Sequence, residues 1–230
     1  MISFENVSKR YPGGHEGVSG IDLHVESGEM VFLTGHSGAG KSTMLRLVAL
    51  LERSTRGQVR VGGRNLSRLS RRLIPYHRRE VGMIFQDHRL LHDRTIFDNV
   101  AMPLIVAGLS HGEVGRRVRA ALDKVGLLQR ERDYPVTLSG GEQQRVGIAR
   151  AVVSRPPVVL ADEPTGNLDP ELSREIFTLF EQFNQVGVTL LIATHDLDLV
   201  KRMNRRTLVL KQGRLVGDNH RDFSPPLARH

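Results

Sequence analysis

Short apolar runs along the chain alternate with segments whose apolar residues repeat at helical spacing. Residues 30–34, 81–85, 158–161 and 188–193 form short apolar runs, which are typical of strands buried on both faces of a sheet. Residues 42–51 carry their apolar side chains on one face of a helix. Because buried strands and helices follow one another, the pattern predicts an α/β fold with a parallel sheet covered by helices on both faces.

Two parts of the chain depart from this pattern. Residues 1–26 and 57–66 alternate polar and apolar positions between glycine turns, which predicts shorter strands in an antiparallel edge sheet. Residues 87–155 contain no convincing strand pattern, so we expect an inserted helical subdomain there. Its helices are expected at residues 98–107, 112–125 and 140–153. The rest of this single domain is expected to be a catalytic α/β core with its β subdomain, at residues 1–86 and 156–217. Residues 218–230 are expected to form a frayed tail.

Composition narrows the class of protein without identifying a ligand. The 230 residues, 39% of them hydrophobic, suffice for a packed core, and the absence of cysteine excludes disulfides and fits a reducing compartment. We find no secretory signal and no apolar run of about 18 residues, so we expect a cytoplasmic protein. The net charge of +8 favours nucleotides, nucleic acid or acidic lipid headgroups as partners, and it fits a merely solvated basic surface equally well.

A glycine-rich segment follows the first buried strand and precedes the first helix. It fits the pattern G-x-x-x-x-G-K-S/T, whose glycines let backbone N–H groups curl around phosphate oxygens at a helix N-terminus. Lys41 can reach the β and γ phosphates, and the Ser42 hydroxyl can ligate Mg²⁺. The residues of this phosphate loop are Gly35, His36, Ser37, Gly38, Ala39, Gly40, Lys41 and Ser42.

Two carboxylates end the buried strand at residues 158–161. Asp162 is placed to hold Mg²⁺, as in other nucleotide-hydrolysing folds with a phosphate loop. Glu163 follows it and can polarise an attacking water. A strand that merely ends in a solvated acidic turn is the alternative, and the phosphate loop elsewhere in the chain disfavours it.

A second glycine-rich helix start occurs at residues 138–144. Ser139 is a good N-cap, and Gly140 and Gly141 expose backbone N–H groups beside it. One nucleotide rarely needs two such cradles from one chain, so the second is expected to serve the nucleotide of another copy. A simple capped helix is the alternative.

These three elements, in this order, resemble the ATP-binding subunits of ABC transporters over roughly residues 1–217. The signature segment at residues 138–142 reads Leu-Ser-Gly-Gly-Glu, a common variant of the family motif. The resemblance implies an ABC-type phosphate-loop ATPase fold that binds ATP and Mg²⁺ and works as a homodimer. It also implies further site residues: Tyr11 stacking on adenine, Thr43 beside the phosphates, Gln86 at Mg²⁺ and the membrane partner, Asp169 in the loop 167–169 at the dimer interface, and His195 at the γ-phosphate.

Within this family, four segments are similar to members that act in bacterial cell division: residues 35–40, 85–91, 93–95 and 180–184. That similarity implies a membrane-protein partner, control of peptidoglycan hydrolases, and a location on the inner face of the cell membrane through the partner. Residues 161–169 are less specific, since lipoprotein-releasing and macrolide-exporting relatives share them. An ATPase subunit of such an exporter is therefore the alternative function.

Three rival functions share parts of this chemistry. DNA-repair ATPases separate the phosphate loop from the signature by a long coiled coil, and Gly35 and Ser139 are too close for that, so no nucleic-acid partner is expected. A small-molecule transporter subunit is disfavoured only by residues 87–95. A scaffold that binds ATP without needing turnover is disfavoured by the intact Glu163 and His195.

A basic segment stands apart from these motifs. No acidic residue occurs between residues 66 and 79, and a patch facing acidic headgroups near the membrane is one interpretation, while a solvated face is the other. Its basic residues are Arg68, Arg71, Arg72, His77, Arg78 and Arg79.

Overall fold

The computed structural model describes residues 1–166 and 168–220. Asn167 and most of the expected tail lie outside this part of the chain. No helix among the described residues is both long enough and apolar enough to span a bilayer.

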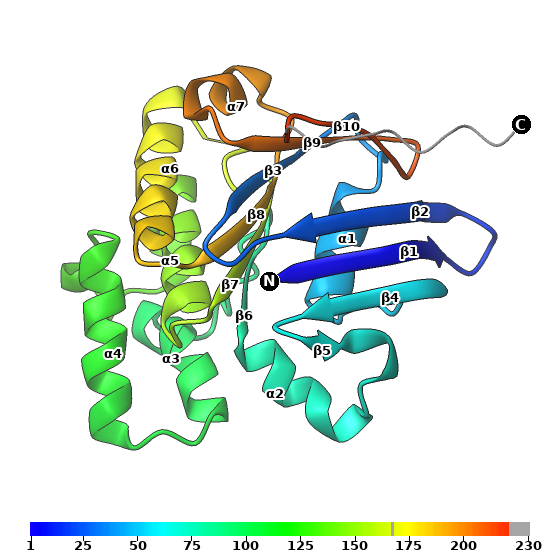
Figure 1. The fold of residues 1–230 in the computed structure, drawn as a ribbon. Coiled ribbons are helices and arrows are strands. Elements are labelled where there is room, and N and C mark those ends of the chain that lie inside the picture. Colours follow the sequence, from blue (N-terminus) through cyan, green and yellow to red (C-terminus); the bar gives the residue numbers. More distant parts are fainter. Residues whose placement is uncertain (167, 221–230) are drawn as a thin grey trace, which may run out of the picture.

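A six-stranded sheet forms the centre of the molecule, in the order β10-β9-β3-β8-β7-β6 (Figure 1). The pairs formed by β3, β6, β7, β8 and β9 are parallel, and β10 is antiparallel to β9. Every residue of β3 and β8 is buried, which explains their continuous apolar runs. The bounds are β3 Met30–Thr34, β6 Val81–Ile84, β7 Val158–Asp162, β8 Thr189–Ala193, β9 Arg206–Lys211 and β10 Arg214–Asp218.

A second sheet, in the order β2-β1-β4-β5, is antiparallel throughout. Its strands are β1 Ile2–Arg10, β2 Glu16–Val25, β4 Arg56–Val61 and β5 Arg64–Asn65. The expectation of shorter strands was wrong for β1 and β2, which have 9 and 10 residues against 5 in β3. One face of β1 is not buried, so this strand can include polar residues on that face. The strand therefore extends further than an unbroken apolar run would indicate.

The segment at 87–155 is helical, as expected, and contains no strand. Side chains cap the starts of two of its helices. Thr95 Oγ1 accepts from the Asp98 N–H at 3.1 Å, and Ser139 forms a capping box with Glu142. The helices of the described chain are α1 Lys41–Val48, α2 Ile74–Arg79, α3 Ile96–Val106, α4 His111–Lys124, α5 Gly140–Val152, α6 Pro170–Gln185 and α7 Leu197–Met203.

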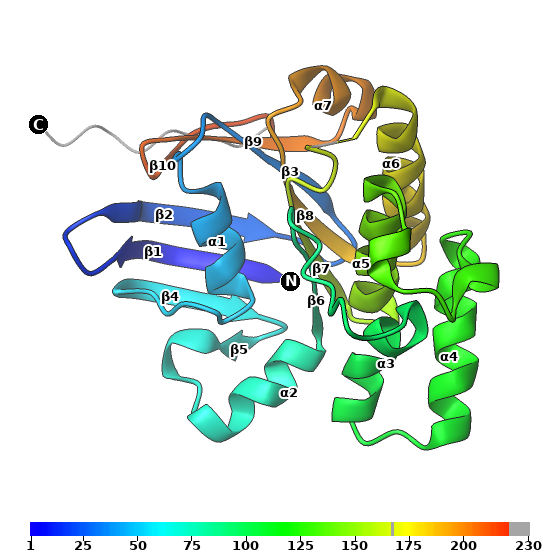
Figure 2. The same cartoon turned by 180° about the vertical axis from the view of Figure 1, so that it is seen from behind.

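Two hydrophobic clusters lie on opposite faces of the parallel sheet. Met30 and Phe32 of β3 face the cluster that contains the apolar sides of α3, α4, α5 and α6. Val31 and Leu33 face the other cluster, which contains α1 and the antiparallel sheet. Figure 2 shows α1 lying across that sheet. The predicted parallel sheet covered on both faces is therefore confirmed, although a second sheet joins α1 on one side.

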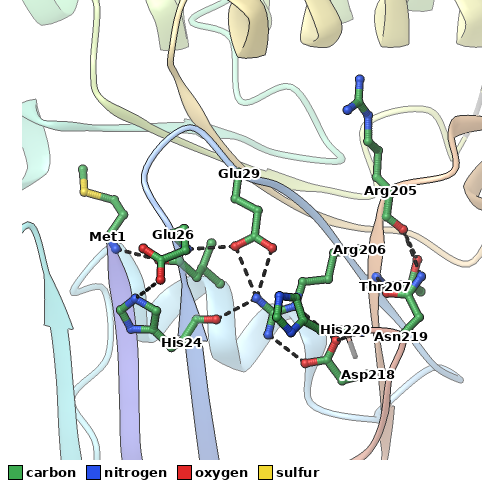
Figure 3. Close-up of polar contacts among 11 residues, drawn as sticks. Met1, His24, Glu26, Glu29, Arg205, Arg206, Thr207, Asp218, Asn219 and His220 are labelled. Atoms are coloured by element: carbon green, nitrogen blue, oxygen red, sulfur yellow. Dashed lines mark hydrogen bonds and ion pairs between the residues drawn. The ribbon is translucent and has the colours of Figure 1, made fainter. Parts of the chain in front are cut away.

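The hairpin β9–β10 was not predicted. Arg206 at the start of β9 binds the Asp218 carboxylate through two nitrogens, at 3.1 and 2.7 Å, and also lies 3.1 Å from a Glu29 oxygen (Figure 3). Its Nη1 donates to the His24 carbonyl at 2.8 Å. This arginine thus connects the hairpin to the start of β3 and the end of β2.

Candidate functional site

The phosphate loop connects β3 to α1 and needs glycine at particular positions. Gly35 and Gly40 have φ angles of 142° and 108°, in the region that disfavours side chains. A Cβ on Gly35 would lie 2.3 Å from the Leu210 carbonyl oxygen, and one on Gly40 would lie 2.5 Å from that of Gly17. The loop therefore packs against β9 and β2, two strands that do not adjoin it in sequence.

Backbone donors of this loop remain available. Among the described residues, no hydrogen-bond acceptor is found for the N–H groups of Gly38, Gly40, Lys41, Ser42 and Thr43. These donors surround the N-terminus of α1, which favours negative charge. A run of unpaired N–H groups at a helix start fits the oxygens of a polyphosphate.

Lys41 lies within the loop and is buried. Its Nζ donates to the Gly35 carbonyl at 2.7 Å and lies 3.6 Å from Glu163 Oε1. The loop and the Glu163 carboxylate together hold the Lys41 ammonium group beside the free N–H donors. A phosphate bound there would form a strong charge-assisted hydrogen bond with Lys41.

Ser42, Gln86 and Asp162 line one cavity of about 580 Å³ between the phosphate loop and the end of β6. The Ser42 hydroxyl donates to Asp162 Oδ1 at 3.0 Å. Burial raises the pKa of the Asp162 carboxyl, the Ser42 hydroxyl opposes that shift, and the charge of Glu163 adds to it. Hydroxyl, amide and carboxylate oxygens are the ligands Mg²⁺ prefers, so this donor set fits that ion.

Glu163 and His195 are in direct contact. The Nδ1 of His195 lies 2.8 Å from Glu163 Oε2, and the His195 N–H donates to the same oxygen at 3.3 Å. Glu163 has a φ of 48°, and its N–H donates to the Ala193 carbonyl at the end of β8. Strand β8 ends at Ala193, where the apolar run at residues 188–193 predicted its end, and Thr194 and His195 lie beyond it.

Tyr11 lies just after β1, beside the phosphate loop. Its hydroxyl is 3.3 Å from Thr43 Oγ1, and a Cβ on Gly17 would lie 2.8 Å from both side chains. Lys9 approaches the ring, with Nζ 5.0 Å from the centroid. The contact brings Tyr11 and Thr43 together at the start of α1. Gly17 and Lys9 also lie close to Tyr11, and no sequence motif had pointed to either of them.

The remaining expected site residues lie apart from the phosphate loop. Ser139 and Gly140 are exposed at the start of α5, while Gly141 is buried. No polar contact between described residues joins residues 139–141 to the loop at residues 35–42. Asp169 caps α6, because its Oδ1 accepts from the Glu171 and Leu172 N–H groups at 2.9 and 3.0 Å.

The basic segment at 68–79 does not form one free face. His77 is buried, its Nε2 lies 2.8 Å from the Val48 carbonyl at the end of α1, and burial lowers its pKa. Arg78 donates to the Leu50 carbonyl and Arg79 to that of Val106. These side chains bind the C-terminal ends of α1 and α3, a role that a count of charges cannot reveal.

Fold and site together define a phosphate-loop ATPase: free loop donors, an adjacent lysine, and two carboxylates at the end of a neighbouring parallel strand. Comparison with known proteins agrees with this class. A family model described as ABC transporter matches residues 18–166. The cell division ATP-binding protein FtsE of Escherichia coli is 58% identical over 217 residues, which cover 94% of this chain and 98% of that protein.

More distant relatives agree. FtsE of Bacillus subtilis is 42% identical over 221 residues, which cover 96% of this chain and 97% of that protein. A dimeric, post-hydrolysis structure of the ATP-binding cassette MJ0796, bound to ADP and Pi, has a TM-score of 0.88 at 34% identity and covers 95% of this chain and 97% of that one. The chain belongs to the ABC transporter family of ATP-binding proteins. The expected fold class and ATPase activity are thereby confirmed.

Proposed function

We propose that this chain is the ATP-hydrolysing subunit of a cell-division complex, in which two copies enclose two Mg-ATP molecules beside a membrane protein resembling FtsX. The observation that carries the ATPase site is the convergence of Ser42, Gln86 and Asp162 on one cavity beside the phosphate loop. The cell-division assignment rests on similarity to FtsE proteins across nearly the whole chain. Control of peptidoglycan hydrolases is implied by the same similarity.

Each residue of the site has a separate task in this proposal. The phosphate loop and Lys41 hold the β and γ phosphates, and Tyr11 stacks on adenine. Thr43 lies beside the phosphates, and its hydroxyl contacts that of Tyr11. Ser42, Gln86 and Asp162 hold Mg²⁺, which when bound neutralises phosphate charge. Glu163 orients and deprotonates the attacking water, with His195 fixing its carboxylate and contacting the γ-phosphate.

The second copy completes the site. Ser139, Gly140 and Gly141 of one copy meet the γ-phosphate held by the other, and Asp169 lies at the interface between the copies. Exposure of Ser139 and Gly140, together with their separation from the phosphate loop of their own chain, supports this arrangement. ATP then stabilises the closed dimer because both copies bind it, and hydrolysis weakens that preference.

The helical subdomain at 87–155 and Gln86 pass this change to the membrane partner, and the partner holds the chain on the inner face of the membrane. Arg68, Arg71 and Arg72 are exposed and remain candidates for contact with acidic lipid headgroups. Charge-reversal variants of these three that bind anionic vesicles as well as the unchanged protein would remove that contact from the proposal.

The test is the ATPase rate per molecule, measured over a range of protein concentrations with and without the co-purified membrane partner. A rate that rises with concentration and again with partner supports a composite site controlled from the membrane. A rate that changes with neither protein concentration nor partner contradicts the composite site, provided that the Glu163→Gln protein also fails to dimerise with ATP. Co-purification with the membrane subunits of a lipoprotein-releasing complex, instead of an FtsX-like protein, would favour the exporter function.

A further inference from the structure

The loop that follows Gln86 has an unusual backbone. His88 and Arg89 are consecutive, are not glycine, and have φ angles of 54° and 49°. Left-handed conformations at such residues are strained and persist only where surrounding contacts hold them. Gln86 is two residues before this pair, so whatever holds the pair also limits where the Gln86 side chain can lie.

One side chain holds both strained residues. Arg150 Nη2 donates to the His88 carbonyl at 2.6 Å, and Nη1 donates to the Arg89 carbonyl at 2.7 Å. No carboxylate among the described residues forms an ion pair with Arg150, so these two carbonyls are its partners. The flat guanidinium presents two parallel donors, which is the geometry needed to bind two successive carbonyl oxygens.

Arg150 belongs to the last turn of α5, the helix that begins with Gly140 after Ser139. The helix passes close to the loop, since a Cβ on Gly147 would lie 3.8 Å from the His88 carbonyl oxygen. One rigid element therefore begins at the signature segment and ends at the loop that carries Gln86. Its 13 residues span roughly 20 Å at 1.5 Å per residue.

We propose that Arg150 is a positioning residue for Gln86: it holds the strained His88–Arg89 backbone and so couples the glutamine to the helix that carries the signature. The proposal rests on the proposed role of Gln86 at Mg²⁺. Movement of α5, when its N-terminus meets the nucleotide of a second copy, then shifts Gln86 through two hydrogen bonds. Lysine cannot substitute fully, because its ammonium group lacks the fixed fork.

The first experiment measures ATPase rate against Mg²⁺ concentration for Arg150→Met, which keeps most of the apolar stem and removes the fork. The Mg²⁺ concentration for half-maximal rate should rise about tenfold, as expected for loss of an outer-shell partner. Affinity for ATP in the absence of Mg²⁺ should stay unchanged. Arg116→Met, on the exposed side of α4, is the control and should leave both values unchanged.

The second experiment tests strain directly, in the Arg150→Met background. Replacing the pair by glycine (His88→Gly with Arg89→Gly) should restore most of the Mg²⁺ dependence, because glycine adopts left-handed angles without steric cost. The matched pair His88→Ala with Arg89→Ala removes the same side chains, keeps the strain, and should not restore it. Equal rescue by both pairs, or by neither, overturns the proposal.

Amide hydrogen exchange over residues 87–91 gives a readout that does not depend on Gln86. It should speed up in Arg150→Met, and in Arg150→Lys if the methionine protein does not fold, and it should slow again with the glycine pair. A Gln86→Ala protein with unchanged Mg²⁺ dependence would instead contradict the proposed metal role of Gln86. If Gln86→Ala alters Mg²⁺ dependence and Arg150→Met alters neither it nor exchange, the positioning role of Arg150 is wrong.

Discussion

The Nδ1 atom of His195 lies 2.8 Å from Oε2 of Glu163, so a histidine beyond one parallel strand fixes the carboxylate at the end of its neighbour. The other carboxylate oxygen lies 3.6 Å from Lys41 Nζ. The left-handed backbone at Glu163 turns the chain at this point, and its N–H is satisfied by the Ala193 carbonyl. Glu163 is thus held between Lys41 of the phosphate loop and His195.

Glu163→Gln should keep ATP binding and slow hydrolysis by roughly 10²–10⁴-fold, because the amide matches the carboxylate in shape and cannot accept a proton. Single-turnover hydrolysis and equilibrium nucleotide binding measure the two effects separately. Glu113→Gln makes the same substitution on α4, outside the proposed site, and should hydrolyse ATP at the normal rate, so it is a suitable control. Turnover near that of the unchanged protein would remove Glu163 from the role of base.

Lys41→Ala should weaken ATP binding by about 10- to 100-fold, since a charge-assisted hydrogen bond contributes about 1.5–3 kcal/mol. The affinity is best measured by titration calorimetry at constant Mg²⁺. Lys124→Ala removes an exposed lysine at the end of α4 and should bind ATP unchanged. Equal affinity of the Lys41→Ala protein would exclude the proposed phosphate contact.

Much of the parallel core and the phosphate loop could be predicted from sequence, because both depend on local signals. A fully buried strand such as β3 reads as an unbroken apolar run, and the loop glycines are dictated by backbone geometry and close packing. Ser42 and Asp162 were expected near one ion, and they are 3.0 Å apart across 120 residues. Parallel strands make this juxtaposition predictable, since their carboxyl ends share one edge.

What could not be predicted depends on long-range contacts. Strand β9 reads as ordinary polar and apolar alternation, and its pairing with β3 is decided by tertiary packing. His77 lies among arginines in the sequence, which suggests an exposed basic patch, yet its ring is buried against the Val48 carbonyl. Arg150 attracts no attention in sequence, because its partners are backbone carbonyls 61 and 62 residues away.

Gly140→Ala should separate the folding of one copy from the assembly of two. A Cβ there meets no atom within 4 Å and φ is not left-handed, so the thermal midpoint should stay equal or rise slightly. A methyl group beside the phosphate of a second copy should nevertheless lower the ATPase rate by roughly 10²-fold, the usual cost of a misplacement of about 1 Å.

Gly112→Ala is the matched control for that change. Gly112 also lies in the first turn of a helix with open space around its Cα, so the substitution should not lower stability and should leave the rate unchanged. Calorimetric melting and ATP-dependent dimerisation of the two proteins provide the comparison. A Gly140→Ala protein that dimerises and turns over normally would show that the second glycine-rich helix start is only a capped helix.

Asp218→Asn should destabilise the fold in a pH-dependent way. Burial opposes ionisation of Asp218, but the Arg206 guanidinium and the His220 N–H together hold its pKa below the usual range. Because the folded-state pKa is the lower one, the contribution to stability is complete above the unfolded pKa of about 4 and is lost as the pH falls through the folded value. We expect a loss of about 2 kcal/mol at pH 7, typical of hydrogen bonds to a charged group, that narrows as the pH falls below about 4. Urea unfolding from pH 7 to pH 3 tests this, with the exposed Asp93→Asn as control. A difference that stays constant with pH would mean that the charge on Asp218 contributes nothing to holding β10 against Arg206.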